Sequence, residues 1–251
     1  VMDDFFEQEL DFPETDHDGN DIAESIFSWN GTAWVQKGVD IDGEAAGDRS
    51  GISVSMPDAN TVAIGADRND GKATFAGHVR IYSWNGSAWT QKGADIDGEA
   101  AGDLSGYSVS LSSNGTIVAI GAYGNDGNGS DAGHVRVYQY TSPNWTQLGL
   151  DIDGEAASDL SGHSVSLSSD GTIVAIGAFA NDGNGSDAGH VRVYQNFSGT
   201  WTQLGGDIDG ENANDWSGNS VSLSSDGTIV AIGANNNDGT ASNAGHVRVY
   251  E

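Results

Sequence analysis

The sequence has 251 residues, of which 37% are hydrophobic, so it is long enough for one large domain or two small ones. Its 37 acidic residues outnumber the 9 basic ones, which gives a formal net charge of −28 at pH 7. This charge excludes ordinary binding to the phosphate backbone of nucleic acids, which requires a basic surface. The absence of cysteine excludes disulfides, thiolate metal sites and a thiol nucleophile. No apolar run approaches the ~20 residues of a membrane span, so we expect no membrane insertion.

The N-terminal segment differs from the rest of the chain. Residues 1–24 are acidic, contain Phe5, Phe6 and Phe12, and do not fit the pattern that follows. Residues 25–251 form a tandem repeat, with copies that begin near residues 51, 106, 162 and 218 and a partial copy before them. The repeat is marked by Ala-Ile-Gly-Ala, whose glycine recurs in three successive steps of 56 residues at Gly65, Gly121, Gly177 and Gly233. The repeat predicts one domain of stacked units that share a core.

Each copy contains four strand signals and no helical period. In the second clear copy we expect strands at 108–112 and 116–122, one around Val135 and Val137, and a short one with Trp145 and Leu148. Asn114-Gly115, between the first two, predicts a two-residue hairpin turn with positive φ. The pattern therefore predicts an all-β chain that forms a β-propeller of four-stranded antiparallel blades. A string of independent hairpin domains is disfavoured, because such sheets cannot bury their apolar faces alone.

The number of blades depends on the partial first copy. Residues 26–34 match the end of the third strand and the start of the fourth in the next copy, and the last copy stops after its third strand. A degenerate blade built from the first 38 residues would make five blades, which we favour. Alternatively, residues 33–37 supply the missing outer strand of the last blade and close the ring.

Three motifs carry a resemblance to a known family. They are Gly-Glu-Ala-Ala-Gly-Asp-Leu-Ser-Gly-Tyr-Ser-Val from residue 98, Val-Ala-Ile-Gly-Ala from residue 118 and Gly-His-Val-Arg-Val-Tyr from residue 133. Together they resemble the FG-GAP repeat of integrin-α-type β-propellers, and the likeness extends over residues 51–251. Ser-Gly replaces Phe-Gly, and Gly-Ala lacks the following proline. The family's calcium loop is not matched either, so calcium is not assigned to Asn114, Asp170 or Asp226.

An up-and-down strand order places two acidic loops of each copy on one face of the propeller. They are the loop between the second and third strands and the link to the next copy. Both contain glycines and the carboxylate and amide oxygens that calcium prefers, so we predict calcium there. The alternative is that these side chains cap their own backbone in Asx-turns. The candidate ligands are Asp126, Asn128, Ser130, Asp131, Asp182, Asn184, Ser186 and Asp187 in the loops, and Asp95, Asp97, Glu99, Asp103, Asp151, Asp153, Glu155 and Asp159 in the links.

A histidine and an arginine recur together on the third strand of every copy. The histidines are His78, His134, His190 and His246, and the arginines are Arg80, Arg136, Arg192 and Arg248. A catalytic histidine is normally unique, so we predict structural hydrogen bonds for these four. One histidine per copy also argues against a transition-metal site. The arginines are expected to pair with acids at the base of the acidic loops, and the repeated tryptophans to pack between blades.

Other positions differ between copies that otherwise agree. Aromatic residues occupy several of them near the acidic loops, and variable loop positions are where recognition resides. We predict ligand contacts at Tyr107, Tyr123, Phe179 and Trp216. Random drift at unconstrained sites is the alternative explanation. The seven Asn-X-Ser/Thr sequons fit a glycosylated, secreted protein. They begin at Asn30, Asn85, Asn114, Asn128, Asn144, Asn184 and Asn196.

The leading functional hypothesis is a non-catalytic, extracellular or cell-surface module for adhesion and assembly. It is calcium-stabilised and presents its acidic face to a protein or glycan partner, with self-assembly as a further option. A lectin-like propeller, whose aromatic residues stack on sugars, is the alternative. A hydrolase ranks third, because the sequence shows no unrepeated carboxylate pair and no nucleophile motif.

Overall fold

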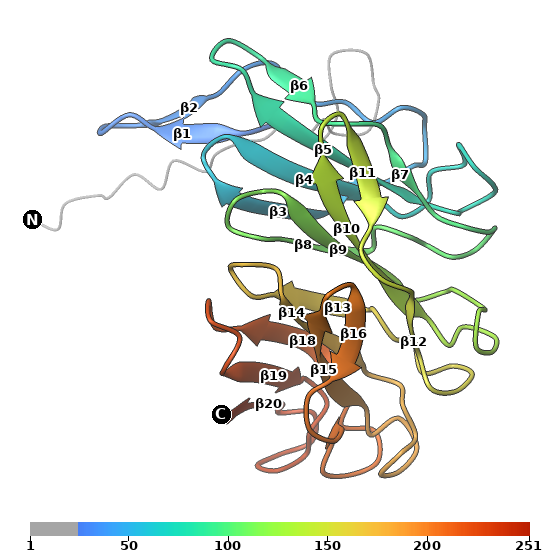
Figure 1. The fold of residues 1–251 in the computed structure, drawn as a ribbon. Helices are drawn as coiled ribbons and strands as arrows, with labels where there is room; N and C mark the ends of the chain where they lie inside the picture. The colour runs from blue at the N-terminus through green and yellow to red at the C-terminus, as the bar shows by residue number, and fades with distance from the viewer. Residues whose placement is uncertain (1–24) are drawn as a thin grey trace, which may run out of the picture.

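The computed structural model describes residues 25–251, and the segment assigned to residues 1–24 lies outside the described residues. All regular elements in 25–251 are β-strands, as the sequence predicted (Figure 1). None of the described residues belongs to a helix that is long and apolar enough to cross a membrane.

Four antiparallel sheets follow one another along the chain, and each is a propeller blade (Figure 1). The first strands are β3 (Ser50–Asp58), β8 (Ser108–Leu111), β13 (Ser164–Leu167) and β18 (Ser217–Leu223). The second strands are β4 (Thr61–Ala66), β9 (Ile117–Ala122), β14 (Ile173–Ala178) and β19 (Val230–Ala234). The third strands are β5 (His78–Trp84), β10 (His134–Thr141), β15 (His190–Phe197) and β20 (His246–Tyr250). The outer strands are β6 (Trp89–Gln91), β11 (Asn144–Gln147) and β16 (Thr200–Gln203).

Short strands in the links extend the first three blades. They are β7 (Ile96–Asp97), β12 (Ile152–Asp153) and β17 (Ile208–Asp209), and each pairs with the third strand of the blade before it. The fourth blade has three described strands, because β20 pairs with β19 alone. These pairings tie the start of each link to the blade that it leaves.

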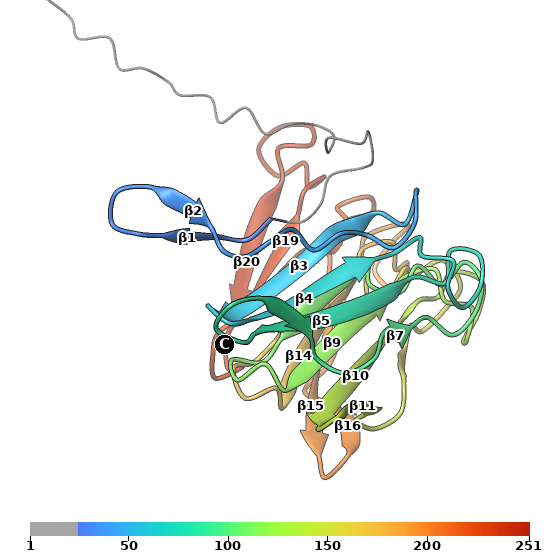
Figure 2. The same ribbon diagram turned by 90° about the horizontal axis from the view of Figure 1, so that it is seen from above.

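The partial first copy forms a separate two-stranded sheet of β1 (Phe27–Trp29) and β2 (Trp34–Gln36). Figure 2 shows this hairpin extending outward from the blades. In the described chain, β2 pairs with β1 and not with β20, so residues 33–37 do not complete the fourth blade of the same chain. A complete fifth blade is not seen, and the count of five stays a prediction.

The turn between the first and second strands differs from the prediction. In the second blade, Leu111 pairs with Val118 and the N–H of Ser112 donates to Ile117 O, so four residues separate the last paired positions. Only Gly115 has positive φ, at 61°. Asn114 stays in ordinary backbone space and accepts the N–H of Thr116 at 3.0 Å. The two-residue turn was wrong because the asparagine side chain caps a longer loop.

The core lies between successive blades. Val135 and Val137 on β10 pack against Val174 and Ile176 on β14, and equivalent layers join the other blades. All four of these side chains are at most 1% exposed. Burying each contributes about 1.5–3 kcal/mol, so the blades are stable only when stacked. The repeated tryptophans close the outer edge as predicted, because Trp145 Nε1 donates to Lys92 O of the preceding blade at 2.6 Å.

Candidate functional site

The two acidic loops of each repeat lie against each other, as the strand order predicted. The loop between the second and third strands of one blade contacts the link that follows that blade. In the second blade, the backbone N–H of Ser158 donates to Ser130 O at 2.8 Å, and that of Leu160 donates to Asp131 O at 3.2 Å. The amide of Asn128 adds a hydrogen bond to Gly154 O at 2.8 Å. The repeat therefore builds one continuous loop face along the blades.

Several predicted calcium ligands hold the loops together through hydrogen bonds. Oδ1 of Asp126 accepts the backbone N–H of Asp131, and Oδ1 of Asp182 accepts that of Asp187, both at 2.8 Å. The hydroxyl of Ser130 donates to Asp131 Oδ2 at 3.4 Å. These are the backbone caps that the alternative interpretation described.

Candidates in the third repeat and in the links have similar structural partners. The amide of Asn184 donates to Gly210 O at 2.7 Å, and the carbonyl of Ser186 accepts the N–H of Asn214. Asp103 and Asp159 are each 2% exposed and accept the N–H groups of Ala100 and Ala156. Asp103 and Asp159 are therefore buried caps rather than open ligands.

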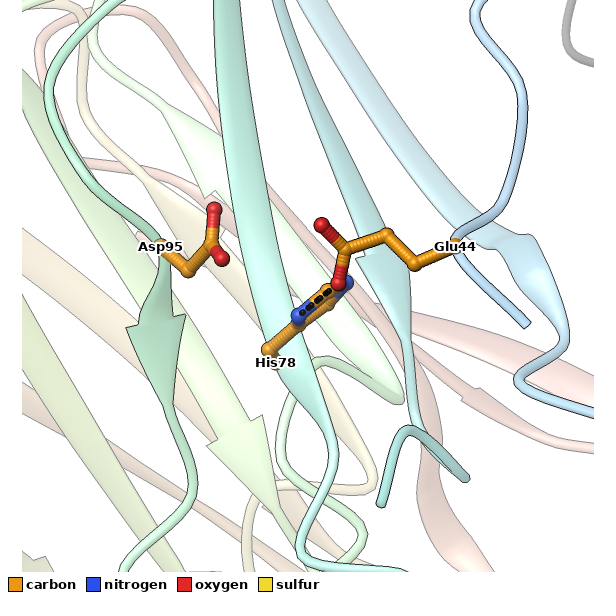
Figure 3. Close-up of side chains that lie close together, drawn as sticks. All are labelled: Glu44, His78 and Asp95. Carbon is orange, nitrogen blue, oxygen red and sulfur yellow. Dashed lines mark ion pairs between the residues drawn. The ribbon is translucent and has the colours of Figure 1, made fainter. Parts of the chain in front are cut away.

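The remaining link acids converge on the repeated histidines. Glu44, His78 and Asp95 come from the link before β3, from the start of β5 and from the link after β6, and they point toward one another (Figure 3). Each offers a ligand atom within 4.8 Å of the other two. The same arrangement recurs as Glu99–His134–Asp151 and Glu155–His190–Asp207. In Figure 3 the dashed line joins His78 Nδ1 to Glu44 Oε2, which are 3.8 Å apart.

Sequence reasoning missed these clusters although it singled out five of the nine residues. One imidazole nitrogen and two carboxylates form a mixed donor set that suits divalent transition metals better than calcium. Gln91 orients Asp95 by donating to its Oδ1 at 2.6 Å. The signal was present in the repeat, because the aspartate follows the histidine by 17 residues in every cluster. The expectation that one histidine per copy stands alone overlooked acids from two different links.

Burial keeps the repeated histidines neutral. Desolvation lowers the pKa of His78 and His190, and it lowers the pKa of His134 to about 4. The neighbouring arginine on the same strand lowers each pKa further. Nε2 of His134 and of His190 is buried without a hydrogen-bond partner, so the expected structural hydrogen bonds are not formed there.

The repeated arginines lock each link onto the third strand. Arg136 donates to Asp97 O at 2.7 Å, and its guanidinium lies 3.6 Å from Glu99 Oε1. It also lies 5.5 Å from the ring centre of Tyr138. Equivalent ion pairs join Arg80 to Glu44, Arg192 to Glu155 and Arg248 to Glu211. The predicted pairing with acids at the base of the loops is therefore confirmed.

The four variable aromatic residues lie in one row that crosses three blades. The ring centres of Tyr107 and Tyr123 are 4.6 Å apart, and those of Phe179 and Trp216 are 5.5 Å apart. His163 connects the two pairs, at 4.9 Å from Tyr107 and 4.6 Å from Phe179. All five side chains are partly exposed. We call Tyr107, Tyr123, His163, Phe179 and Trp216 the aromatic row.

An ion pair replaces the aromatic residues in the first blade. Arg49 and Asp67 occupy the repeat positions of Trp216 and Tyr123, and Arg49 Nη1 lies 3.2 Å from Asp67 Oδ2. Asp67 is fully buried, burial raises its pKa, and its Oδ1 has no hydrogen-bond partner. Asp67 is close enough to Tyr123 to help raise the pKa of that phenol. His163 Nδ1 is also buried and unpartnered. Two unsatisfied polar atoms therefore accompany the aromatic row, and buried polar groups rarely lack partners.

The predicted glycosylation sites differ in accessibility. The asparagines of six sequons are exposed, namely Asn30, Asn85, Asn114, Asn128, Asn144 and Asn184. Asn128 and Asn184 already donate to carbonyls of the links. Asn196 is half-buried, and its Nδ2 is buried without a partner.

Known structures share this fold at low sequence identity. The putative 6-phosphogluconolactonase from Bacteroides uniformis is 12% identical with a TM-score of 0.57, over 90% of this chain and 60% of that one. The hydrazine synthase of Kuenenia stuttgartiensis is 12% identical with a TM-score of 0.47, over 78% of this chain and 45% of that one. The chain thus spans about half to three fifths of the length of these structures, and the likeness concerns the fold alone.

The sequence comparisons agree with the repeat. No curated protein matches the sequence as a relative. Residues 94–138 match the model of the FG-GAP repeat. This segment runs from the link before the second blade to Tyr138 on its third strand, so it contains the loops and the Arg136 lock described above. With four successive blades built on the same repeat, the chain is an FG-GAP-type β-propeller.

Proposed function

We propose that this chain is a non-catalytic, extracellular binding module whose ligand contacts the aromatic row. The observation that carries the proposal is the contiguity of the row, which joins residues from three blades beside two unpartnered polar atoms. Residues that differ between copies have here been collected into one surface. The fold alone does not require this, because the first blade has an ion pair at the same positions.

The chemistry of the row favours a neutral or cationic partner. Rigid aromatic rings supply apolar contact area at a low entropic cost, and they dominate binding energy in protein interfaces. Oδ1 of Asp67 accepts hydrogen bonds from hydroxyl or N–H groups. The net charge of −28 opposes the approach of anions. Neutral glycans and basic protein segments fit these properties, as expected for an adhesion module or a lectin-like propeller.

Truncating the row is expected to abolish binding. A double variant with Phe179→Ala and Trp216→Ala removes two adjoining rings, and we expect at least a tenfold loss of affinity, since such anchors contribute ≥2 kcal/mol each. The measurement is binding to an array of neutral glycans and to immobilised extracellular-matrix proteins. Trp29→Ala is the control, because Trp29 is 55% exposed on the β1–β2 hairpin, away from the row. An equal loss in the control would contradict the assignment. Glycan binding that survives chelation would identify the lectin-like mode.

Calcium is proposed as a stabiliser of the same loop face. Ligand binding to the native state alone adds RT ln(1 + [L]/Kd) per site, about 2.7 kcal/mol at a hundredfold excess over Kd. The loop acids have capacity for a cation, because Asp126 and Asp182 each use one carboxylate oxygen as a backbone cap. Calcium prefers oxygen donors such as these.

Calcium is expected to raise the melting temperature more than sodium does at equal ionic strength. Screening of the negative charge stabilises in both salts, so the matched comparison isolates site binding. A double variant with Asp126→Asn and Asp182→Asn keeps the capping oxygens and removes two charges. It should lose part of the calcium gain and none of the sodium gain. If the two salts act alike on the parent protein, the loops bind no calcium.

A further inference from the structure

The two ends of the blade array are complementary halves of one blade. β20 occupies the repeat positions of residues 78–82 in β5, whereas β1 occupies those of residues 82–84. The pairing of Trp29 with Trp34 reproduces that of Trp84 with Trp89, so β1–β2 has the register of an outer blade edge. The fourth blade lacks such an edge, since β20 pairs with β19 alone in the described chain. Together, β18–β20 and β1–β2 contain all four strands of a blade.

The apolar faces next to these half-blades are exposed. Val247 and Val249 on β20 are 68% and 66% exposed, whereas Val135 and Val137 at the same repeat positions are buried by the following blade. At the opposite end, Met56 on β3 is 43% exposed, although its counterpart Leu111 is 7% exposed and packs on the preceding blade. Each end therefore presents one side of the contact that joins the blades inside the chain.

The polar contacts of an interface are also prepared at the open end. A Cβ at Gly65, Gly121 or Gly177 would overlap a glycine carbonyl of the following blade, so the close approach of the backbones requires glycine. Gly233 occupies the same position, yet no other blade approaches it in the described structure. Similarly, the hydroxyls of Ser53, Ser108 and Ser164 donate to the following blade at 2.7–2.8 Å, and Ser220 has no such partner there.

The acidic cluster of the fourth blade is incomplete in the same way. Glu211 Oε2 lies 3.7 Å from His246 Nδ1, as in the other three blades, but no described aspartate completes the group. The aspartate of the other clusters follows the outer strand of the blade. Asp40 follows β2 at that repeat position. A second copy that supplied β1–β2 would therefore supply the missing acid as well.

We propose that a second copy of this chain docks head to tail on the fourth blade. The β1–β2 hairpin of the second copy completes the outer edge, and its β3 face covers Val247 and Val249. The three blade contacts within the chain are the template, because both partner surfaces carry the residues that form those contacts. Such a contact joins two different surfaces of the same molecule, so it closes into a ring or extends into a filament.

Light scattering coupled to gel filtration tests the proposal. The parent chain is expected to shift from 25.9 kDa to a multiple of that mass as its concentration rises. The shift should be greater in high salt, because two chains of charge −28 repel each other. Val249→Asp should weaken association at least tenfold without changing the far-ultraviolet circular dichroism spectrum. Leu150→Asp is the control, since Leu150 is 86% exposed and lies in the link after β11. A chain that stays monomeric throughout, or an equal effect of both variants, would overturn the proposal.

A cysteine pair distinguishes two copies from closure within one chain. Leu111 N donates to Ser55 Oγ across a blade contact at 2.9 Å, and the same contact at the open ends would join Ser222 to Met56 of the second copy. The chain contains no cysteine, so a mixture of a Ser222→Cys chain and a Met56→Cys chain can form only introduced disulfides. We expect a cross-linked heterodimer on oxidation. The double variant forming a disulfide within a monomer instead would show ring closure in one chain and refute the second copy.

Discussion

Replacing Gly177 with alanine is expected to destabilise the protein by about 3 kcal/mol and to lower its melting temperature by roughly 10 °C. A Cβ at this position would overlap the carbonyl oxygen of Gly218 in the next blade and the Ser164 hydroxyl of its own blade. The hydroxyl can rotate, but the carbonyl is backbone and is held by the β18–β19 sheet. The strain must therefore separate the third and fourth blades, which share the buried layer around Val191 and Ile232.

The matched control is the same substitution at the same repeat position of the fourth blade. Gly233→Ala would meet only the side chain of Ser220 within 3.5 Å, so a rotamer change relieves the contact. At low protein concentration we expect less than ~1 kcal/mol of destabilisation, close to a surface substitution. Thermal unfolding monitored by circular dichroism compares the two variants. Equal losses of stability would show that the glycine is required within the blade rather than between blades.

Replacing Arg136 with alanine is expected to cost about 2–3 kcal/mol, against less than 0.5 kcal/mol for Lys72→Ala. The arginine substitution leaves Asp97 O without its donor and removes the ion pair with Glu99. It also removes the cation above the ring of Tyr138. Lys72 is exposed, so its charge is solvated in the folded and unfolded states alike. Urea unfolding of both variants measures the difference, and equal midpoints would contradict a structural role for the arginine.

Lys92 would be the wrong control, although the sequence placed it on an exposed edge strand. Its Nζ donates to Gly115 O of the next blade at 2.5 Å and lies 4.8 Å from the ring centre of Tyr140. Burial lowers its pKa. A second readout separates the effect of Arg136 on charge from its effect on packing. Arg136 helps lower the pKa of His134, so in the Arg136→Ala variant that pKa should move up toward its ordinary value.

Features that depend on neighbours along the chain could be predicted from the sequence. The 56-residue spacing, the alternation in the first strand and the apolar second strand predicted four-stranded blades, because strand formation and hairpin order follow from local patterns. The same topology placed both acidic loops on one face and assigned an acid to each arginine. Asn114 was misjudged because its side chain bonds depend on the exact loop length, which a dipeptide does not specify.

The tertiary structure alone decided how distant residues combine. Glu44, His78 and Asp95 come from three segments, and only the pairing of β7 with β5 brings the links close enough to form a cluster. The aromatic row depends on the distance between adjacent blades, which the buried layers and the backbone contact at Gly177 set. Ring closure depends on the angle between blades, a property of packing that no single repeat encodes. The local repeat therefore specified the blade, whereas the contacts between blades determined the candidate site and the open ends.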